Sequence, residues 1–278
     1  AHLNTINPRT TGLVTATAAT KLTGTAAAIN TLIGNEGDSG DKVNLDTDFL
    51  VTIAAGSVSA AHLNTINAAT TGLVTATAVT ALTGTAAVIN TLVGNEGDSG
   101  DKVNLDTDYT ATITDTDTTA ALLNTVNGNV PGLVTATSVT NITGTAAAIN
   151  TLMGNEGESG NKINLNTTFT VTVDAGTVAA DHLNTISGKT TGLVTATDVS
   201  TITGTAAAIN TLVGDEGDSG DKVNLDGDFL VTIAAGTASA AHLNTINAKT
   251  TGLVTATDVS TITGTAAVSY THLTLPTI

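Results

Sequence analysis

Short apolar stretches alternate along the chain with hydroxyl residues and glycines, and some of these stretches have the spacing of a helix. The first covers residues 25–33, where apolar side chains recur at i, i+3 and i+4 from Ile29 onward and so share one face. A hydroxyl at Thr23 or Thr25 is typical of a helix N-cap. Gly34 is placed to end this helix in the left-handed conformation.

A second helix is predicted over residues 59–66, with Ser59 as its N-cap and Ala60, Leu63 and Ile66 on one side. Helices of two or three turns are not stable alone in water. Both predicted helices must therefore pack against other elements.

The packing partners are predicted strands over residues 43–45, 49–53 and 73–77, which alternate in polarity and are rich in β-branched residues. A strand followed by a helix occurs twice in each repeat of the sequence, so we expect two related coils per repeat. One coil cannot bury its own apolar face, whereas stacked coils bury each other's. The predicted fold class is an α/β repeat solenoid with short strands, short helices and about two coils per repeat. The alternative is a row of β-rich tandem modules.

The 60-residue period is explicit in the sequence. The phrase TGLVTAT, which is PGLVTAT in one copy, begins at Thr11, Thr71, Pro131, Thr191 and Thr251. We therefore expect one elongated array over residues 1–267. It consists of a partial repeat 1–10, repeats that start at residues 11, 71, 131 and 191, and a partial repeat 251–267. Because neither end carries a capping repeat, we expect the chain to be a piece of a longer protein.

The repeat pattern stops near the end of the chain. Residues 268–278 read VSYTHLTLPTI and resemble an in-frame translation of the transposon-end adapter used in sequencing libraries. We interpret this tail as non-native, the alternative being a divergent natural terminus.

Composition excludes several functional classes. The chain has 278 residues, and its 24 acids against 8 bases give a net charge of −16. That balance argues against nucleic acid and anionic membranes as partners, because both are bound by clustered Lys and Arg. The absence of cysteine excludes disulfides and thiolate chemistry. No apolar run is long enough to predict a membrane span.

Most of the acids lie in a Gly-rich segment that recurs at residues 34–48, 94–108, 154–168 and 214–228. Close carboxylates repel one another unless a cation screens them, and oxygen ligands in a Gly-rich loop suit Ca²⁺. We therefore regard calcium as the candidate cofactor. The candidate ligands are Glu36, Asp38, Asp41, Asp46, Asp48, Glu96, Asp98, Asp101, Asp106, Asp108, Asp215, Glu216, Asp218, Asp221, Asp226 and Asp228.

The alternative is a solvated acidic face that keeps a long polymer in solution, because the spacing fits neither an EF-hand nor the nonapeptide calcium repeat. The copy at residues 154–168 provides an internal control, since Asn161, Asn166 and Thr168 replace acids there. Each copy also carries one lysine, for which we expect an ion pair within the loop: Lys42, Lys102, Lys162 and Lys222.

Other apparent motifs do not indicate catalysis. The GDSG at residues 37–40 is followed by Asp41 and has no matching histidine and acid, so we expect no enzyme activity. A histidine recurs at one helix position, and Leu122 replaces it in one repeat. Copies on stacked coils lie too far apart to share a metal ion, so we interpret this histidine as a surface or packing residue. It occurs at His2, His62, His182 and His242.

The phrase over residues 57–92 resembles the tandem repeats of giant secreted cell-surface proteins of marine bacteria, and related phrases occur in bacteriophage tail fibres. The resemblance implies export and a structural, adhesin-like role at the cell surface. It implies neighbouring repeats as partners, with surface or environmental glycans or other surface proteins as further ones. A phage tail-fibre shaft and an ice-binding Thr-rich surface remain alternatives. Ice-binding solenoids carry a Thr-x-Thr on every coil, whereas here the motif of residues 15–17 recurs only once per repeat.

Overall fold

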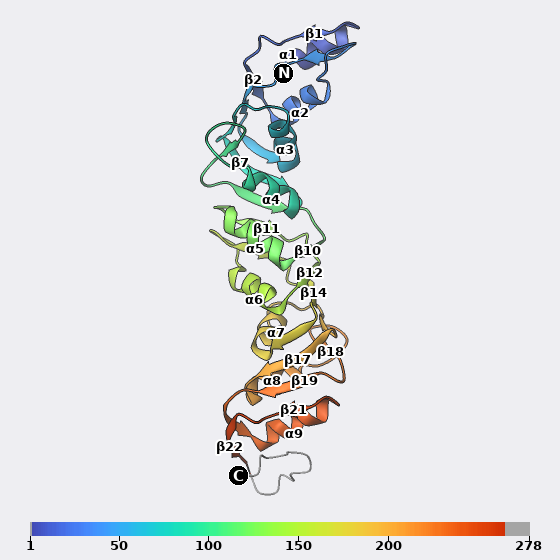
Figure 1. Cartoon of the computed structure of the whole chain (residues 1–278), viewed down its shortest axis with the longest axis vertical. Coiled ribbons are helices and arrows are strands. Elements are labelled where there is room, and N and C mark those ends of the chain that lie inside the picture. Colours follow the sequence, from blue (N-terminus) through green and yellow to red (C-terminus); the bar gives the residue numbers. More distant parts are fainter. Residues whose placement is uncertain (1, 265–278) are drawn as a thin grey trace. The chain divides into compact units, whose positions relative to one another are not determined.

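The computed structural model describes residues 2–264 and alternates short α-helices with short strands that pair in parallel sheets (Figure 1). The chain divides by its contacts into two compact bodies that interleave in sequence. Of the described residues, the first body comprises 2–115, 122–138 and 156–165, and the second comprises 116–121, 139–155 and 166–264. The predicted α/β class is confirmed. The tail over residues 268–278 lies outside the described residues.

Helices follow the strands at regular intervals. Residues 2–264 contain nine α-helices: α1 (His2–Ile6), α2 (Ala26–Gly34), α3 (Ala60–Ala68), α4 (Ala86–Gly94), α5 (Ala120–Asn129), α6 (Ala146–Asn155), α7 (Ala180–Ser187), α8 (Ala206–Gly214) and α9 (Ala240–Lys249). A 3-10 helix, η1 (Asn7–Arg9), follows α1.

The first body contains three parallel sheets. The smallest pairs β1 (Val14–Thr15) with β3 (Val43–Asn44). The second has the order β2 (Lys21–Gly24), β4 (Leu50–Ile53), β6 (Val74–Ala76) and β8 (Val103–Leu105). The third has the order β5 (Gly56–Ser59), β7 (Val79–Gly84), β9 (Thr110–Ile113), β11 (Val134–Ala136) and β13 (Ile163–Leu165).

The second body repeats this arrangement. Its largest sheet has the order β10 (Asp117–Thr119), β12 (Asn141–Gly144), β14 (Thr170–Val173), β16 (Val194–Ala196) and β18 (Val223–Leu225). A second sheet has the order β15 (Gly176–Ala179), β17 (Val199–Gly204), β19 (Leu230–Ile233) and β21 (Val254–Thr255). The smallest pairs β20 (Gly236–Ser239) with β22 (Val259–Thr263).

The register of each sheet follows the repeat. In the first body Val51 pairs with Val74, and Val74 pairs with Val103. The second body pairs Val171 with Val194 and Val194 with Val223 in the same way. The same pairing therefore recurs two repeats later in the chain.

The structure has one more strand before each predicted helix than the sequence predicted: β3, β4 and β5 precede α3, where two strands were predicted, and two precede α4, where one was predicted. In the chain β4 and β5 lead into α3, and β6 and β7 lead into α4. The predicted strands at 43–45, 49–53 and 73–77 are confirmed, whereas the strands β2, β5 and β7 were not predicted. The unpredicted strands are rich in Gly, Ser and Thr, and their apolar side chains are too few to produce a clear alternation.

Both predicted helix starts are confirmed, and one predicted helix end is wrong. Thr25, and not Thr23, is the N-cap of α2, and its hydroxyl accepts a hydrogen bond from the backbone N–H of Ala28 at 3.2 Å. Ser59 is the N-cap residue of α3, although its side chain makes no capping hydrogen bond. Gly34 is helical and does not adopt a positive φ; the C-cap is Asn35, at φ −99°.

The core lies between the helices and one face of the sheets. On β9 the residues alternate, with Ala111 and Ile113 buried and Thr110 and Thr112 exposed. The helices supply buried aliphatic side chains, such as Ile89 of α4, which is fully buried. In the first body α3 and α4 both contact β7 (Figure 1). Burying an aliphatic side chain of this size contributes about 1.5–3 kcal/mol, so contacts between neighbouring elements dominate stability.

A close backbone contact explains the glycine of the TGLVTAT phrase. Thr70 donates a hydrogen bond from its hydroxyl to the carbonyl of Phe49 at 2.6 Å and accepts one from the N–H of Gly72 at 3.0 Å. A Cβ on Gly72 would lie 2.6 Å from the carbonyl oxygens of Asp48 and Phe49. Glycine is therefore required where the chain passes over the backbone that leads into β4.

Asparagine side chains connect successive helices. Asn64 of α3 donates a hydrogen bond from Nδ2 to the carbonyl of Val88 in α4 at 2.9 Å. In the second body Asn184 makes the same bond to Ala208 at 2.9 Å. The helices thus carry polar links as well as apolar contacts between neighbours.

Candidate functional site: the acidic loops

The acidic segments connect a helix to a strand at the end of a sheet. The first follows α2 and leads into β3, and the second follows α4 and leads into β8. The strands β8 and β13 in the first body and β18 in the second are each the last in their sheet. The acidic side chains are therefore concentrated where a parallel ladder ends.

Each loop folds back along the free edge of the strand that follows it. In the first copy the N–H of Val43 donates to the carbonyl of Asn35 at 2.9 Å, and the carbonyl of Val43 accepts from Gly37 at 3.1 Å. Equivalent bridges recur between Glu96 and Val103 and between Glu216 and Val223. The loop thereby occupies hydrogen-bonding groups that an edge strand otherwise offers to another chain.

Two glycines make this tight loop possible. Gly40 has a φ of +72°, the left-handed conformation that glycine adopts without strain. A Cβ on Gly37 would lie 3.1 Å from Cγ of Lys42, so the lysine stem covers the glycine. The Gly-rich pattern thus reflects backbone geometry and close packing, which sequence reasoning had associated with a cation.

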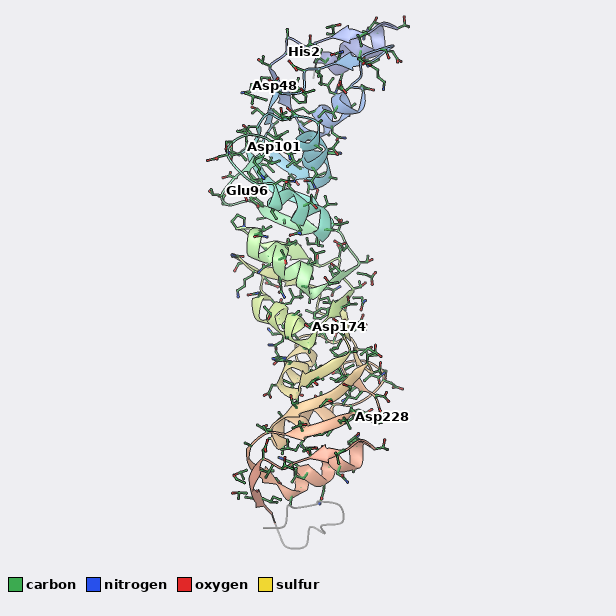
Figure 2. The ribbon with its side chains drawn as sticks, viewed as in Figure 1. His2, Asp48, Glu96, Asp101, Asp174 and Asp228 are labelled. Atoms are coloured by element: carbon green, nitrogen blue, oxygen red, sulfur yellow. The ribbon has the colours of Figure 1, made fainter. Side chains whose placement is uncertain are left out.

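The candidate calcium ligands lie at the surface. Of the sixteen acids, Asp106 and Asp215 are half-buried and the other fourteen are exposed. Figure 2 shows Asp48, Glu96 and Asp101 at the surface of the first body and Asp228 at that of the second. Within residues 2–264, no three His, Asp or Glu side chains come close enough together to hold a metal ion. The structure does not assemble these acids into a ready-made site, and calcium binding stays a prediction.

Some of the acids have local partners in the loop backbone. Asp46 accepts a hydrogen bond from the N–H of Thr47 at 2.8 Å, and Asp106 accepts one from Thr107 at 2.7 Å. In the last copy Asp226 accepts one from Gly227 at 2.6 Å. These bonds stabilise the turn before the next strand, as aspartates commonly do.

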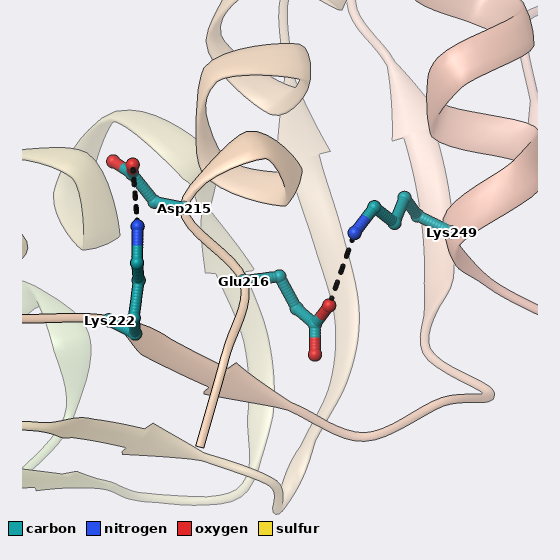
Figure 3. Close-up of polar contacts among 4 residues, drawn as sticks. All are labelled: Asp215, Glu216, Lys222 and Lys249. Carbon is teal, nitrogen blue, oxygen red and sulfur yellow. Dashed lines mark hydrogen bonds and ion pairs between the residues drawn. The ribbon is translucent and has the colours of Figure 1, made fainter. Parts of the chain in front are cut away.

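Lysines partly neutralise the last loop (Figure 3). Lys222 lies 3.9 Å from Asp215, which confirms in this copy the predicted ion pair within the loop. Lys249 from α9 lies 3.3 Å from Glu216. The four side chains are 36–49% exposed, so solvent screens both pairs and each contributes little to stability.

One buried aromatic residue lies beside an acidic loop. Tyr109 follows the second loop and is 1% exposed, and its hydroxyl donates to the carbonyl of Asn129 at 3.4 Å. Burial raises the pKa of this phenol above its usual range, and the negative charge of Glu96 raises it further. Partial desolvation also raises the pKa of the Glu96 carboxyl. Phe49, Phe169 and Phe229 take the position of Tyr109 in the other copies.

Three of the four predicted histidines, His2, His62 and His182, lie at surface cavities. His62 and His182 are half-buried and line equivalent cavities in the first and second bodies respectively. Sequence reasoning did not find these cavities, because the residues that form them are mainly alanine, serine and threonine. The one sequence signal was the change from histidine to Leu122 in a single repeat.

None of the helices within residues 2–264 is both long enough and apolar enough to cross a membrane. Comparison of the chain with protein-family models, with curated proteins and with solved structures finds no match.

Proposed function

We propose that the chain is a non-enzymatic solenoid segment that forms a stalk or adhesive shaft of a large extracellular surface protein. The observation that carries this proposal is that a single sheet takes its strands from three consecutive repeats. In the first body β5 belongs to the repeat that starts at residue 11, β7 and β9 to that at 71, and β11 and β13 to that at 131. Repeats that share a sheet depend on one another for folding.

The same pairing argues against a row of independent modules. The strand β6 of the repeat that starts at residue 71 pairs with β4 of the repeat before it, and β9 of the same repeat pairs with β11 of the repeat after it. The helix α3 likewise contacts α4 of the following repeat. The side-chain bond of Asn64 also reaches the following helix. A single repeat cut from the chain would lose these partners at both ends.

The placement of charge suits a long polymer at a surface. The acids lie on loops that close the last strand of a sheet, where charge discourages further strand pairing. A large net charge also keeps a repetitive chain in solution. These features support a structural role.

A series of chain lengths tests the proposal. Variants of one, two and four repeats, covering residues 11–70, 11–130 and 11–250, are compared by small-angle X-ray scattering and thermal unfolding. A solenoid predicts that the single repeat is unfolded and that thermal stability rises with repeat number. It also predicts a constant cross-section with a maximum dimension that grows in proportion to length. A stable single repeat with the melting temperature of the longest variant would favour independent modules.

Location is tested separately. Antibodies against residues 11–250 should label intact cells of the source organism without permeabilisation. Labelling only after permeabilisation contradicts the surface role. Labelling of virus particles in place of cells favours the tail-fibre alternative.

Rows of threonine support ice binding as a second candidate function. Thr83, Thr112 and Thr135 are paired neighbours on β7, β9 and β11. Equivalent rows join Thr143 to Thr172 and Thr195, and Thr203 to Thr232 and Thr255. A hydroxyl therefore recurs on three successive strands, which the count of one Thr-x-Thr per repeat had missed.

Thermal hysteresis tests this second function directly. The unaltered chain should depress the freezing point below the melting point, and Thr112→Lys with Thr135→Lys should reduce the gap. Equal freezing and melting points at millimolar protein would exclude ice binding and leave the structural proposal intact.

A further inference from the structure

A surface cavity lies between the start of α2 and the segment that leads into α3. Its volume is about 240 Å³, and its lining includes Thr25, Ala26, Ala27, Ala55 and His62. None of the lining residues is acidic, although the chain as a whole carries a net charge of −16. The cavity thus combines a helix N-terminus with an imidazole in a locally uncharged setting.

The helix offers an unused donor to this cavity. The first N–H groups of a helix have no acceptor within the helix, and they carry the positive end of its dipole. The hydroxyl of Thr25 satisfies the N–H of Ala28. Ala26 is only 3% exposed, and among the described residues its N–H has no acceptor. A ligand that accepts from this N–H supplies the partner that the helix itself lacks.

The next repeat shows which group fits this position. There the equivalent N–H, that of Ala86, donates to Oδ2 of Asp115 at 2.6 Å. Asp115 is equivalent to Ala55, which lines the cavity in the earlier repeat. The cavity therefore lies where the neighbouring repeat places a carboxylate of its own.

The histidine changes together with that carboxylate. His62, His182 and His242 occur in repeats whose residue at the position of Ala55 is alanine, and Leu122 occurs in the repeat that has Asp115. A histidine at this helix position is thus present in each repeat that lacks the internal carboxylate. The repeats without the carboxylate thus carry an imidazole that can hydrogen-bond to an anion, and the repeat with Asp115 carries leucine instead.

We propose that the cavity beside His62 binds the carboxylate group of a ligand, held by the N–H at the start of α2 and by the imidazole. The bound carboxylate takes the place that the Asp115 side chain takes in the next repeat. This inference is independent of the proposed structural role, because it depends only on the geometry of one cavity and its copy.

The equivalent cavity in the second body, beside His182, carries an acidic side chain. The cavity beside His182 has a volume of about 180 Å³ and the same helix start, but its lining includes the carboxylate of Asp174. A carboxylate ligand is repelled by that side chain. We therefore expect the His182 cavity to bind more weakly than the His62 cavity.

Histidine resonances report binding without assignment of the repetitive backbone. The chain has five histidines, and their ring protons are assigned by single His→Gln variants. The full chain is titrated with sodium acetate at constant pH, and a parallel titration with sodium chloride corrects for ionic strength. We expect a saturable shift of the His62 ring proton with a dissociation constant on the order of 10 mM, a smaller shift at His182, and no shift at His62 with chloride.

Two reciprocal variants use residues that the chain itself accepts at these positions. Ala55→Asp should fill the cavity and abolish the acetate shift of His62. Asp115→Ala with Leu122→His should create a new histidine signal that responds to acetate. Circular dichroism confirms that each variant is folded. Equal shifts in acetate and chloride, or a His62 shift that persists in Ala55→Asp, would overturn the proposal.

Glucuronate and N-acetylglycine then distinguish a sugar acid from a peptide-like carboxylate. Tighter binding of one of them than of acetate identifies the source of the group. Binding by acetate with no response to either larger acid would contradict a ligand-binding role, because the cavity would then admit only a solvent anion.

Discussion

Substitution of Gly72 by alanine tests whether the close passage of one backbone segment over another holds neighbouring strands in register. The added Cβ would lie 2.6 Å from the carbonyl oxygens of Asp48 and Phe49. Because Gly72 does not have a positive φ, the whole cost is steric and none is conformational. The segment must move by several tenths of an ångström to relieve the contact.

That movement also weakens the hydrogen bonds that join the segments. Thr71 donates from its N–H to the carbonyl of Thr47 at 2.9 Å, and Val51 donates to Leu73 at 3.0 Å. Overpacking costs about 1–3 kcal/mol, and each weakened bond adds about 0.5–1.5 kcal/mol. We therefore expect Gly72→Ala to destabilise this region by about 2–4 kcal/mol.

Native-state hydrogen exchange measures the local effect, which suits an array whose repeats need not unfold together. The protection of the Val51 amide should fall by about 30- to 1,000-fold, since each 1.4 kcal/mol is a factor of ten. Gly94→Ala is the matched control, because Gly94 lies in a helix with nothing within 4 Å of an added Cβ. Alanine should leave that helix unchanged or stabilise it by about 0.5–1 kcal/mol. Equal protection in the two variants would refute the close-passage argument.

Three further predictions concern single side chains and the loops. The pKa of Tyr109 is raised in the folded state, so above about pH 10 this phenol ionises in the unfolded state first and the unaltered chain loses stability. Tyr109→Phe should abolish this loss. Absorbance at 295 nm follows the ionisation, and urea unfolding measures the stability. Asn64→Ala should destabilise by about 1–2 kcal/mol in urea unfolding, whereas Thr65→Ala, whose hydroxyl bonds within its own helix, should change little. If the acidic loops bind calcium, calorimetry should show the strongest binding at residues 214–228 and the weakest at 154–168, and no heat at millimolar calcium would end that hypothesis.

The sequence predicted those parts of the fold in which local pattern and packing agree. The helices α2 and α3 lie within two residues of their predicted ends, because an N-cap hydroxyl and an apolar face both indicate them. Strands such as β5 were missed because their positions are set by pairing with segments that are distant in sequence. The prediction for Gly34 was wrong because a glycine after an apolar face can either end the helix in the left-handed conformation or be its last helical residue. Only the path of the following loop distinguishes these two cases.

The candidate site was harder to predict than the fold. Composition correctly located the acids in loops, but carboxylate-rich sequence does not indicate whether the side chains converge or point into solvent. The bond between Asp115 and Ala86 could not be predicted, because it joins distant parts of the sequence through the register of two strands. The replacement of His62 by Leu122 in the next repeat is visible in the sequence. Only the structure shows that His62 lies beside the start of α2, and that Asp115 accepts a hydrogen bond from the equivalent helix start in the next repeat.

The position of the acids follows from how the sheets end. A strand such as β3 has one edge paired with β1, and the N–H and carbonyl of Val43 face the other side. If those groups were unpaired, another chain could add a strand at this edge. The risk of such aggregation is high in this protein, because its repeats contain many copies of nearly the same strand sequence. The loop covers the edge with its own backbone and surrounds it with charge, so a single segment both completes the hydrogen bonding and repels a competing strand. The concentration of acids after the helices is thus explained without a bound cation. The loop at residues 154–168 covers its edge in the same way but carries fewer acids, so charge protects that edge least.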